Sequence, residues 1–153
     1  MALNPDFYDL LKLLNDGKVE YLVVGGYAVM YYSEPRFTKD LDIWINPVPE
    51  NARAVWRALA EYGAPLEKVS LDDFCNLEMI YQIGLAPNRI DILMDVAGVD
   101  FAIAWQRRKV TQYGDVPMNM ISREDLIAAK LASGREQDLL DAKGLQKDRP
   151  TVD

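Results

Sequence analysis

Val23-Val24-Gly25-Gly26-Tyr27-Ala28 is followed along the chain by Asp40-Leu41-Asp42-Ile43, with thirteen residues between Gly26 and Asp40. The β-branched and aromatic residues 21–24 predict a strand, the two glycines a tight turn, and residues 27–32 a helix. A helix that starts at such a turn presents unpaired N–H groups to an anion. This stretch therefore predicts a turn between a strand and a helix that has the right size to bind a phosphate group.

The second half of the motif alternates carboxylate and aliphatic side chains. Residues 40–45 predict a strand in which Asp40 and Asp42 project from one face. Leu41 and Ile43 then point into the opposite layer. An Asp-x-Asp pair alone often serves solubility or a turn, and a lone Gly-Gly is often an ordinary strand-to-helix turn. The combination of the two is what indicates a functional site.

A third carboxylate, Asp91, lies within residues 89–96, which predict another strand with Asp91 and Asp95 on one face. Aspartate is disfavoured inside strands, and burial penalises its charge. Three carboxylates about 6 Å apart repel one another by roughly 3 kcal/mol per pair at an effective dielectric near 20. We therefore expect a bound cation or a functional demand to retain them.

The sequence contains no histidine, which excludes histidine-based triads, imidazole bases and histidine-ligated zinc. Carboxylates are left as the abundant groups for acid, base or metal chemistry, and hard oxygen ligands select magnesium or manganese. Two divalent ions about 4 Å apart in such a cluster can hold a triphosphate and an attacking hydroxyl together. The pattern predicts phosphoryl or nucleotidyl transfer.

Length and composition fit one globular domain over residues 1–146, with a flexible tail over 147–153. The net charge of −7 disfavours unaided docking onto long nucleic acid. Cys75 is the only cysteine, which excludes an internal disulfide. The longest apolar segment, residues 21–32, is too short to span a bilayer, so we expect a cytoplasmic protein without membrane contact.

The rest of the chain alternates helical and extended patterns. Helical spacing and caps predict helices over residues 5–15, 50–62 and 101–106, and two more after Ser122 that are divided at Gly134. Extended patterns predict a strand over 74–83 and a hairpin of 109–113 with 116–120. The expected fold class is α/β of the α+β type.

These motifs together resemble the DNA polymerase β-like nucleotidyltransferase superfamily, whose signature is a hydrophobic residue, Gly-Gly or Gly-Ser, a spacer, and Asp-hydrophobic-Asp/Glu-hydrophobic. Val24-Gly25-Gly26 and Asp40-Leu41-Asp42-Ile43 match it with a spacer at the upper length limit, and Asp91 matches the separate third carboxylate. Residues 35–42 and 125–138 also resemble small bacterial proteins near the AbiEii toxin-type branch.

The resemblance implies a mixed β-sheet flanked by helices, with a short C-terminal helical segment. It implies that Asp40, Asp42 and Asp91 are catalytic and hold Mg²⁺ or Mn²⁺, with Asp91 nearest the acceptor hydroxyl. The nucleotide-binding residues it implies are Gly25, Gly26, Arg36, Thr38, Lys39 and Lys130.

Each of these cationic residues also has a purely structural interpretation, because exposed Arg and Lys commonly solvate a surface. Thr38 is a β-branched residue entering a strand, which needs no ligand. Arg135 and Asp138 stand three apart on a helix and are expected to pair with each other.

The expected activity is metal-dependent transfer of a nucleoside monophosphate from a nucleoside triphosphate to an acceptor hydroxyl, with release of pyrophosphate. The acceptor stays open between an RNA end such as that of tRNA, a partner protein and a small molecule. The alternative is a non-catalytic nucleotide-binding or toxin–antitoxin component of the same fold, with a small antitoxin-like protein as its partner.

Overall fold

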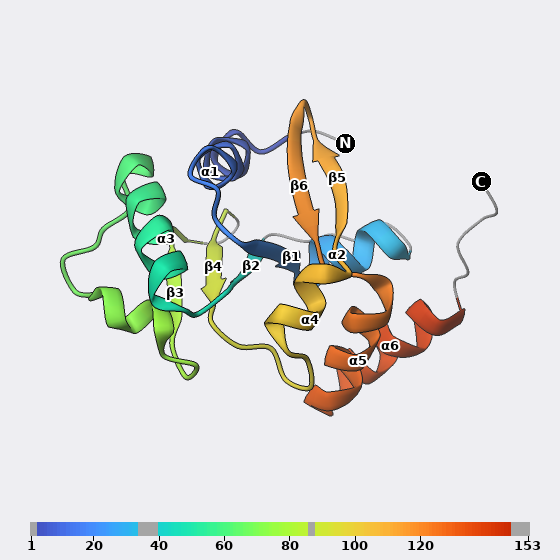
Figure 1. Ribbon diagram of the computed structural model, residues 1–153. Helices are drawn as coiled ribbons and strands as arrows, with labels where there is room; N and C mark the ends of the chain where they lie inside the picture. Colours follow the sequence, from blue (N-terminus) through green and yellow to red (C-terminus); the bar gives the residue numbers. More distant parts are fainter. Residues whose placement is uncertain (1–2, 34–39, 86–87, 148–153) are drawn as a thin grey trace.

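The computed structural model describes residues 3–33, 40–85 and 88–147, which form one six-stranded sheet with helices around it (Figure 1). The strand order across the sheet is β3-β4-β2-β1-β6-β5. The elements in chain order are α1 (Pro5–Asp16), β1 (Tyr21–Val24), α2 (Gly25–Tyr32), β2 (Leu41–Ile45), α3 (Pro49–Tyr62), the 3₁₀ helix η1 (Leu71–Cys75), β3 (Ile80–Ile83), β4 (Ile90–Leu93), α4 (Phe101–Gln106), β5 (Lys109–Tyr113), β6 (Val116–Met120), α5 (Arg123–Ser133) and α6 (Glu136–Lys147).

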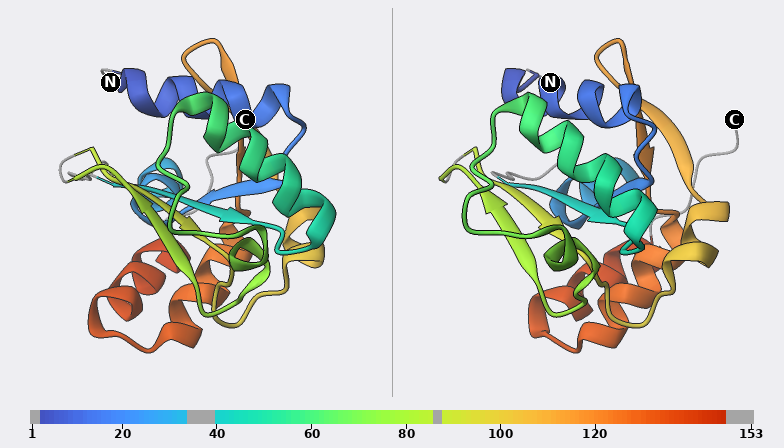
Figure 2. Two further views of the ribbon diagram at one scale, coloured as in Figure 1. Left: turned by 90° about the vertical axis from the view of Figure 1, so that its left-hand side faces the viewer. Right: turned by 60° about the vertical axis from the view of Figure 1, so that its left-hand side comes forward.

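The sheet is mixed. Strand β2 pairs antiparallel with β1 and parallel with β4, while β6 pairs parallel with β1 and antiparallel with β5. Helices α1 and α3 lie on one side of this sheet, and α5 and α6 lie on the other (Figures 1 and 2). The predicted mixed sheet flanked by helices, with a helical C-terminal segment, is confirmed.

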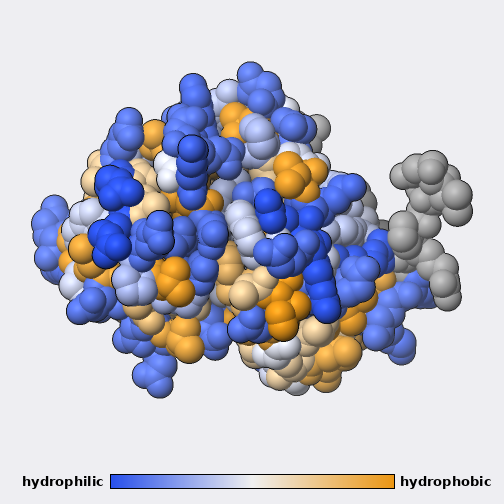
Figure 3. Space-filling view, viewed as in Figure 1, coloured by the Kyte–Doolittle hydropathy of each residue, from blue (hydrophilic) through white to orange (hydrophobic). Residues whose placement is uncertain are grey.

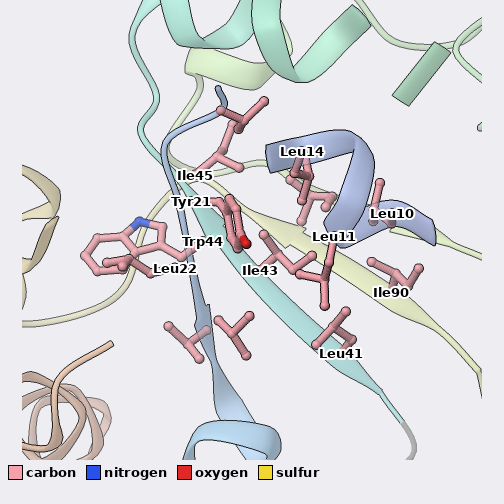
Figure 4. Close-up of a cluster of buried hydrophobic side chains, with 14 of the residues drawn as sticks. Leu10, Leu11, Leu14, Tyr21, Leu22, Leu41, Ile43, Trp44, Ile45 and Ile90 are labelled. Atoms are coloured by element: carbon pink, nitrogen blue, oxygen red, sulfur yellow. The ribbon is translucent and has the colours of Figure 1, made fainter. Parts of the chain in front are cut away.

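The main hydrophobic core lies between the sheet and α1 with α3. Leu10, Leu11 and Leu14 of α1 are fully buried, and Figure 4 shows them beside Leu41 and Ile43 of β2. Trp44 and Leu22 point to the opposite side of the sheet in the same view. The predicted alternation of β2 is therefore present, with Leu41 and Ile43 in the core and Asp42 on the other face.

Three predicted elements differ from the structure by two residues or more at one end. Helix α2 starts at Gly25, two residues earlier than predicted, and β4 ends at Leu93, so Asp95 lies beyond the strand. The strand predicted over 74–83 is wrong over residues 74–79, where η1 ends at Cys75 and a turn leads to β3. Reciprocal capping between Ser70 and Asp73 starts η1, and this local preference outweighs the extended pattern.

The predicted division of the C-terminal region is confirmed. Gly134 separates α5 from α6 in a left-handed conformation with φ of +69°. Lys147, predicted to begin the tail, is the last residue of α6, and the rest of the predicted tail lies outside the described residues.

Arg123 at the start of α5 ties three helices together. Its guanidinium donates to the carbonyl oxygen of Tyr32, at 2.7 Å, and to that of Leu145. These carbonyls belong to the last turns of α2 and α6, where backbone acceptors lack helical partners. One side chain therefore fixes the end of α2 against both C-terminal helices.

Hydrophilic side chains cover much of the face seen in Figure 3. Within the described part of the chain, none of the helices has the length and apolar character needed to cross a membrane.

Asn51 in α3 joins the helix to both central strands. Its side chain accepts from the backbone N–H of Glu20, at 2.8 Å, and donates to the carbonyls of Glu20 and Asn46, at 3.0 and 2.9 Å. Asn51 is only 7% exposed, so water cannot replace these partners easily. The start of β1 and the end of β2 therefore depend on one buried amide.

Replacing Asn51 by alanine should lower the free energy of unfolding by about 2–4 kcal/mol, because three part-buried backbone groups each lose a hydrogen bond. Urea denaturation of Asn51→Ala measures this loss. Arg53→Ala, at an exposed position of the same helix, is the control and should stay within about 0.5 kcal/mol of the wild type. Equal stabilities of the two variants would contradict the role of Asn51.

Candidate active site

The glycine turn lies where β1 passes directly into α2. Gly25 has a φ of +67°, a left-handed conformation that favours glycine. Val24 at the helix N-cap makes no side-chain hydrogen bond to the first turn. The helix therefore begins with backbone N–H groups that no capping side chain satisfies, an arrangement that suits an anion.

Gly25 is packed against the carboxylate of Asp42. The antiparallel pairing of β1 with β2 places Val24 opposite Asp42. A Cβ atom built on Gly25 would lie 2.1 Å from Oδ2 of Asp42, far inside van der Waals contact. The Asp42 carboxylate thus occupies the space that any side chain at position 25 would need, and the turn and the carboxylate form one packed unit.

Asp42 and Asp91 lie side by side on neighbouring strands. The parallel pairing of β2 with β4 aligns them directly, and Asp91 is only 8% exposed. Burial, followed by the charges of Asp91 and Asp40, raises the pKa of Asp42 to about 6. The ionised form of Asp42 is therefore less stable in the folded chain than in an exposed aspartate, and a cation bound beside it would oppose this effect.

Arg89, directly before β4, holds the other two carboxylates. Its Nε and one terminal nitrogen donate to both oxygens of Asp91, at 2.9 and 3.2 Å. The same terminal nitrogen lies 3.0 Å from Oδ2 of Asp40. These bonds to the two carboxylates raise the pKa of Arg89 above its usual value. Over residues 3–33, 40–85 and 88–147, no three His, Cys, Asp or Glu side chains stand as a ready metal site.

A cavity of about 350 Å³ opens between the glycine turn and the C-terminal helices. Gly25, Gly26 and Asp42 line one side of it. Lys130 and Arg135 line the other side. This volume lies at the lower end of the range for small-molecule sites, about 300–1,000 Å³. The cavity therefore has the backbone of the glycine turn on one wall and cationic side chains on the other.

Lys130 is held in a buried ion-pair network between α5 and α6. Its Nζ lies 3.0 Å from Asp138 and 3.2 Å from Asp141, and its side chain is 13% exposed. Asp138 also accepts from Ser133 and from Arg135, which confirms the predicted Arg135–Asp138 pair. The network fixes the charged wall of the cavity.

Four of the predicted site residues meet at this cavity: Gly25, Gly26, Asp42 and Lys130. Asp40 and Asp91 do not line it, but lie next to Asp42 and are joined by Arg89. Arg36, Thr38 and Lys39 lie outside the described residues.

Sequence reasoning missed two contributors to the site, Arg89 and Ser133. The signal for Arg89 is its position two residues before Asp91, which places both side chains on one face of the chain. Its contact with Asp40 depends on the parallel register of β2 with β4, which the sequence does not display. Ser133 lines the cavity and donates to Asp138, a contact that depends on how α5 packs on α6.

A family model described as "Nucleotidyltransferase of unknown function (DUF6036)" matches residues 6–146. The chain belongs to this nucleotidyltransferase family. A search of curated protein sequences finds no significant match.

Solved structures share the fold of this nucleotidyltransferase. The lincomycin-bound lincosamide antibiotic adenylyltransferase LnuA superposes with a TM-score of 0.60 at 19% identity, over 97% of this chain and 100% of that one. Thermotoga maritima TM1012, assigned as a nucleotidyltransferase, gives 0.63 at 16% identity over 97% of both chains. The antibiotic-resistance factor ANT(2'')-Ia gives 0.60 at 12% identity, over 93% of this chain and 81% of its own. The predicted nucleotidyltransferase membership and fold are confirmed, while the AbiEii-type branch stays a prediction.

Replacing Gly25 by alanine should displace Asp42 and destabilise the protein. Gly134→Ala is a matched control, because Gly134 has a φ of +69° against +67° for Gly25 but nothing within 4 Å of an added Cβ. The control should cost about 1–2 kcal/mol of backbone strain. Gly25→Ala should cost clearly more in urea denaturation, and a loss equal to that of the control would refute the close packing on Asp42.

The lowered pKa of Asp138 predicts that the folded protein loses stability in acid. Although burial raises the pKa of Asp138, hydrogen bonds from Ser133 and Lys130 and the Lys130 charge bring it from 3.8 down to about 2. A lowered pKa stabilises the folded chain above pH 3.8, and this contribution is lost as the pH falls towards 2. The difference in unfolding free energy between wild type and Asp138→Asn should therefore shrink between pH 5 and pH 2.5. A difference that stays constant over this range would contradict the assignment.

Proposed function

We propose that this nucleotidyltransferase moves a nucleoside monophosphate from a nucleoside triphosphate to a hydroxyl group of an acceptor, and releases pyrophosphate. The observation that carries the proposal is the cavity in which the glycine turn and Asp42 face Lys130 and Arg135. An open helix start and a half-buried carboxylate on one wall, with cations on the other, match the alternating charges of a triphosphate bound with divalent ions.

In this proposal, the N–H groups at Gly25 and Gly26 bind phosphate oxygens, since the backbone can approach closely where no Cβ intervenes. Lys130 and Arg135 lie across the cavity and donate hydrogen bonds to phosphate oxygens, while their ion pairs with Asp138 hold them in place. Arg36, Thr38 and Lys39 remain proposed nucleotide-binding residues of the segment between α2 and β2.

The donors at Asp40, Asp42 and Asp91 are carboxylate oxygens, which fit Mg²⁺ or Mn²⁺. The raised pKa of Asp42 supports this fit, because desolvation and two neighbouring carboxylates outweigh the opposing charge of Arg89 at this position. When bound there, such a metal would neutralise the phosphates and help position them for in-line attack.

The order of the strands suggests how the two substrates are arranged. From the glycine turn, the sheet runs through Asp42 on β2 to Asp91 on β4, and then to the edge strand β3. With the triphosphate at the turn, the acceptor lies on the Asp91 side. The acceptor oxygen then forms a bond to the α-phosphorus, the bond from that phosphorus to the β-phosphate oxygen breaks, and Asp91 takes the hydroxyl proton.

We propose a small hydroxyl-bearing molecule as the acceptor. LnuA is a lincosamide antibiotic adenylyltransferase, and its entire chain is matched by the fold of this one. This fold therefore serves a small-molecule acceptor in that relative. The net charge of −7 opposes an RNA acceptor, for which electrostatic attraction supplies much of the affinity.

The first test is transfer from each of the four α-phosphate-labelled nucleoside triphosphates, with Mg²⁺ or Mn²⁺ and a cell lysate. Protein, RNA and small-molecule products are separated afterwards. Asp42→Asn is expected to abolish labelling without unfolding the chain, because the amide removes the negative charge between the turn and Asp91. A labelled small-molecule fraction would identify both the nucleotide and the acceptor class.

Asp72→Asn, at an exposed position of η1, is the matched control and should label as the wild type does. Label in the RNA or protein fraction would replace the proposed acceptor class. Binding of nucleotide without any labelled product, together with tight capture of a small protein, would favour the non-catalytic toxin–antitoxin alternative.

A further inference from the structure

Arg89 occupies a position fixed by the backbone of two strands. Leu41 aligns with Ile90 in the parallel β2–β4 pair, and the Leu41 N–H donates to the carbonyl of Arg89 at 3.0 Å. Arg89 is therefore level with Asp40, two residues before the aligned pair Asp42 and Asp91. Three aspartates, Asp40, Asp42 and Asp91, therefore lie together with Arg89 around the first residues of β2 and β4.

The guanidinium takes up the oxygens that a cation would need. It makes a two-point contact with Asp91, at 2.9 and 3.2 Å, and a third contact with Oδ2 of Asp40, at 3.0 Å. Two-point Arg–carboxylate contacts are among the strongest hydrogen bonds in proteins, and they hold the carboxylate plane in one orientation. Both oxygens of Asp91 are thus turned towards Arg89.

The same contacts of Arg89 offset the electrostatic repulsion among the three neighbouring carboxylates of the metal-free chain. The side chain of Asp91 is only 11% exposed and that of Asp40 29%, so solvent screens their repulsion incompletely. One guanidinium supplies a shared positive charge to both. A divalent ion at these oxygens would meet that guanidinium as a like charge at close range.

We propose that Arg89 is a built-in counter-cation of the carboxylate cluster, which a divalent metal must displace from Asp40 and Asp91 in order to bind. Arg89 thereby sets the metal affinity and stabilises the metal-free chain. This inference rests on the proposed function only in placing the metal at Asp40, Asp42 and Asp91. It assigns Arg89 a positioning role, because it acts through these carboxylates.

The test is a titration of the purified protein with Mn²⁺, in which free Mn²⁺ is followed by electron paramagnetic resonance without nucleotide. Arg89→Gln should bind Mn²⁺ about tenfold more tightly than the wild type, a change that corresponds to about 1.4 kcal/mol. Its metal-free melting temperature should be lower, and the rise on adding Mn²⁺ larger. Arg89→Lys keeps the charge without the two-point contact and should fall between the two.

Arg107→Gln is the control, because it breaks an Arg–Asp contact of 3.1 Å to Asp125 away from the cluster. Its Mn²⁺ affinity should equal that of the wild type. Unchanged or weaker Mn²⁺ binding by Arg89→Gln would overturn the proposal, since Arg89 would then orient the carboxylates for the metal or play no part in binding it.

Asp42→Asn separates this inference from the proposed function. If Asp42→Asn binds Mn²⁺ more weakly than the wild type while Arg89→Gln binds no more tightly, the metal site stands and only the role of Arg89 fails. If Asp42→Asn leaves Mn²⁺ binding unchanged, the metal site itself fails, and the inference about Arg89 fails with it.

Discussion

The contact between Gly25 and Asp42 is the constraint on which the candidate site depends. It requires a residue without Cβ at the end of β1, a left-handed backbone there, and a carboxylate directly opposite on β2. Once these three conditions hold, the start of α2 and an acidic side chain share one wall of the cavity. The parallel strand β4 then extends the acidic row to Asp91, so the site follows from the order of three adjacent strands.

Two cations in this acidic chain are each shared between two aspartates. Arg89 bridges Asp40 and Asp91 beside the sheet, and Lys130 bridges Asp138 and Asp141 between the C-terminal helices. Asp138 is also paired with Arg135, so two cations face the two aspartates between the C-terminal helices. Asp42 lies between these two groups of charges, and its pKa is raised to about 6. The chain thus concentrates negative charge at the place where the proposed reaction brings phosphates and metal together.

Local sequence signals were sufficient for most of the architecture. Gly134 and the Gly-Gly pair mark helix boundaries through backbone freedom alone, and the alternation of β2 assigns each of its side chains to a face. The strand predicted over residues 74–83 was wrong at its start, because the Ser70–Asp73 capping pair starts η1 there. This pair is also a local signal, but the extended pattern of the residues that follow concealed it. The superfamily motif located Asp42 and the glycines for the same reason, since it is short and contiguous.

The contacts that modify the site could not be predicted in the same way. Arg89 reaches Asp40 only through the register of two strands about fifty residues apart in sequence. Lys130 meets Asp138 and Asp141 only because α6 turns back along α5 after Gly134. Both contacts depend on tertiary geometry, which composition and periodicity do not encode.

The three-helix contact of Arg123 has a consequence for ligand size. The cavity lies between the start of α2 on one wall and α5 with α6 on the other, and Arg123 joins the end of α2 to both of these helices. Any widening of the cavity has to stretch or break those bonds to carbonyl oxygens. Arg123 therefore limits how far α2 can separate from α5 and α6. The size of the molecule that the cavity admits depends in part on Arg123, although Arg123 does not line the cavity.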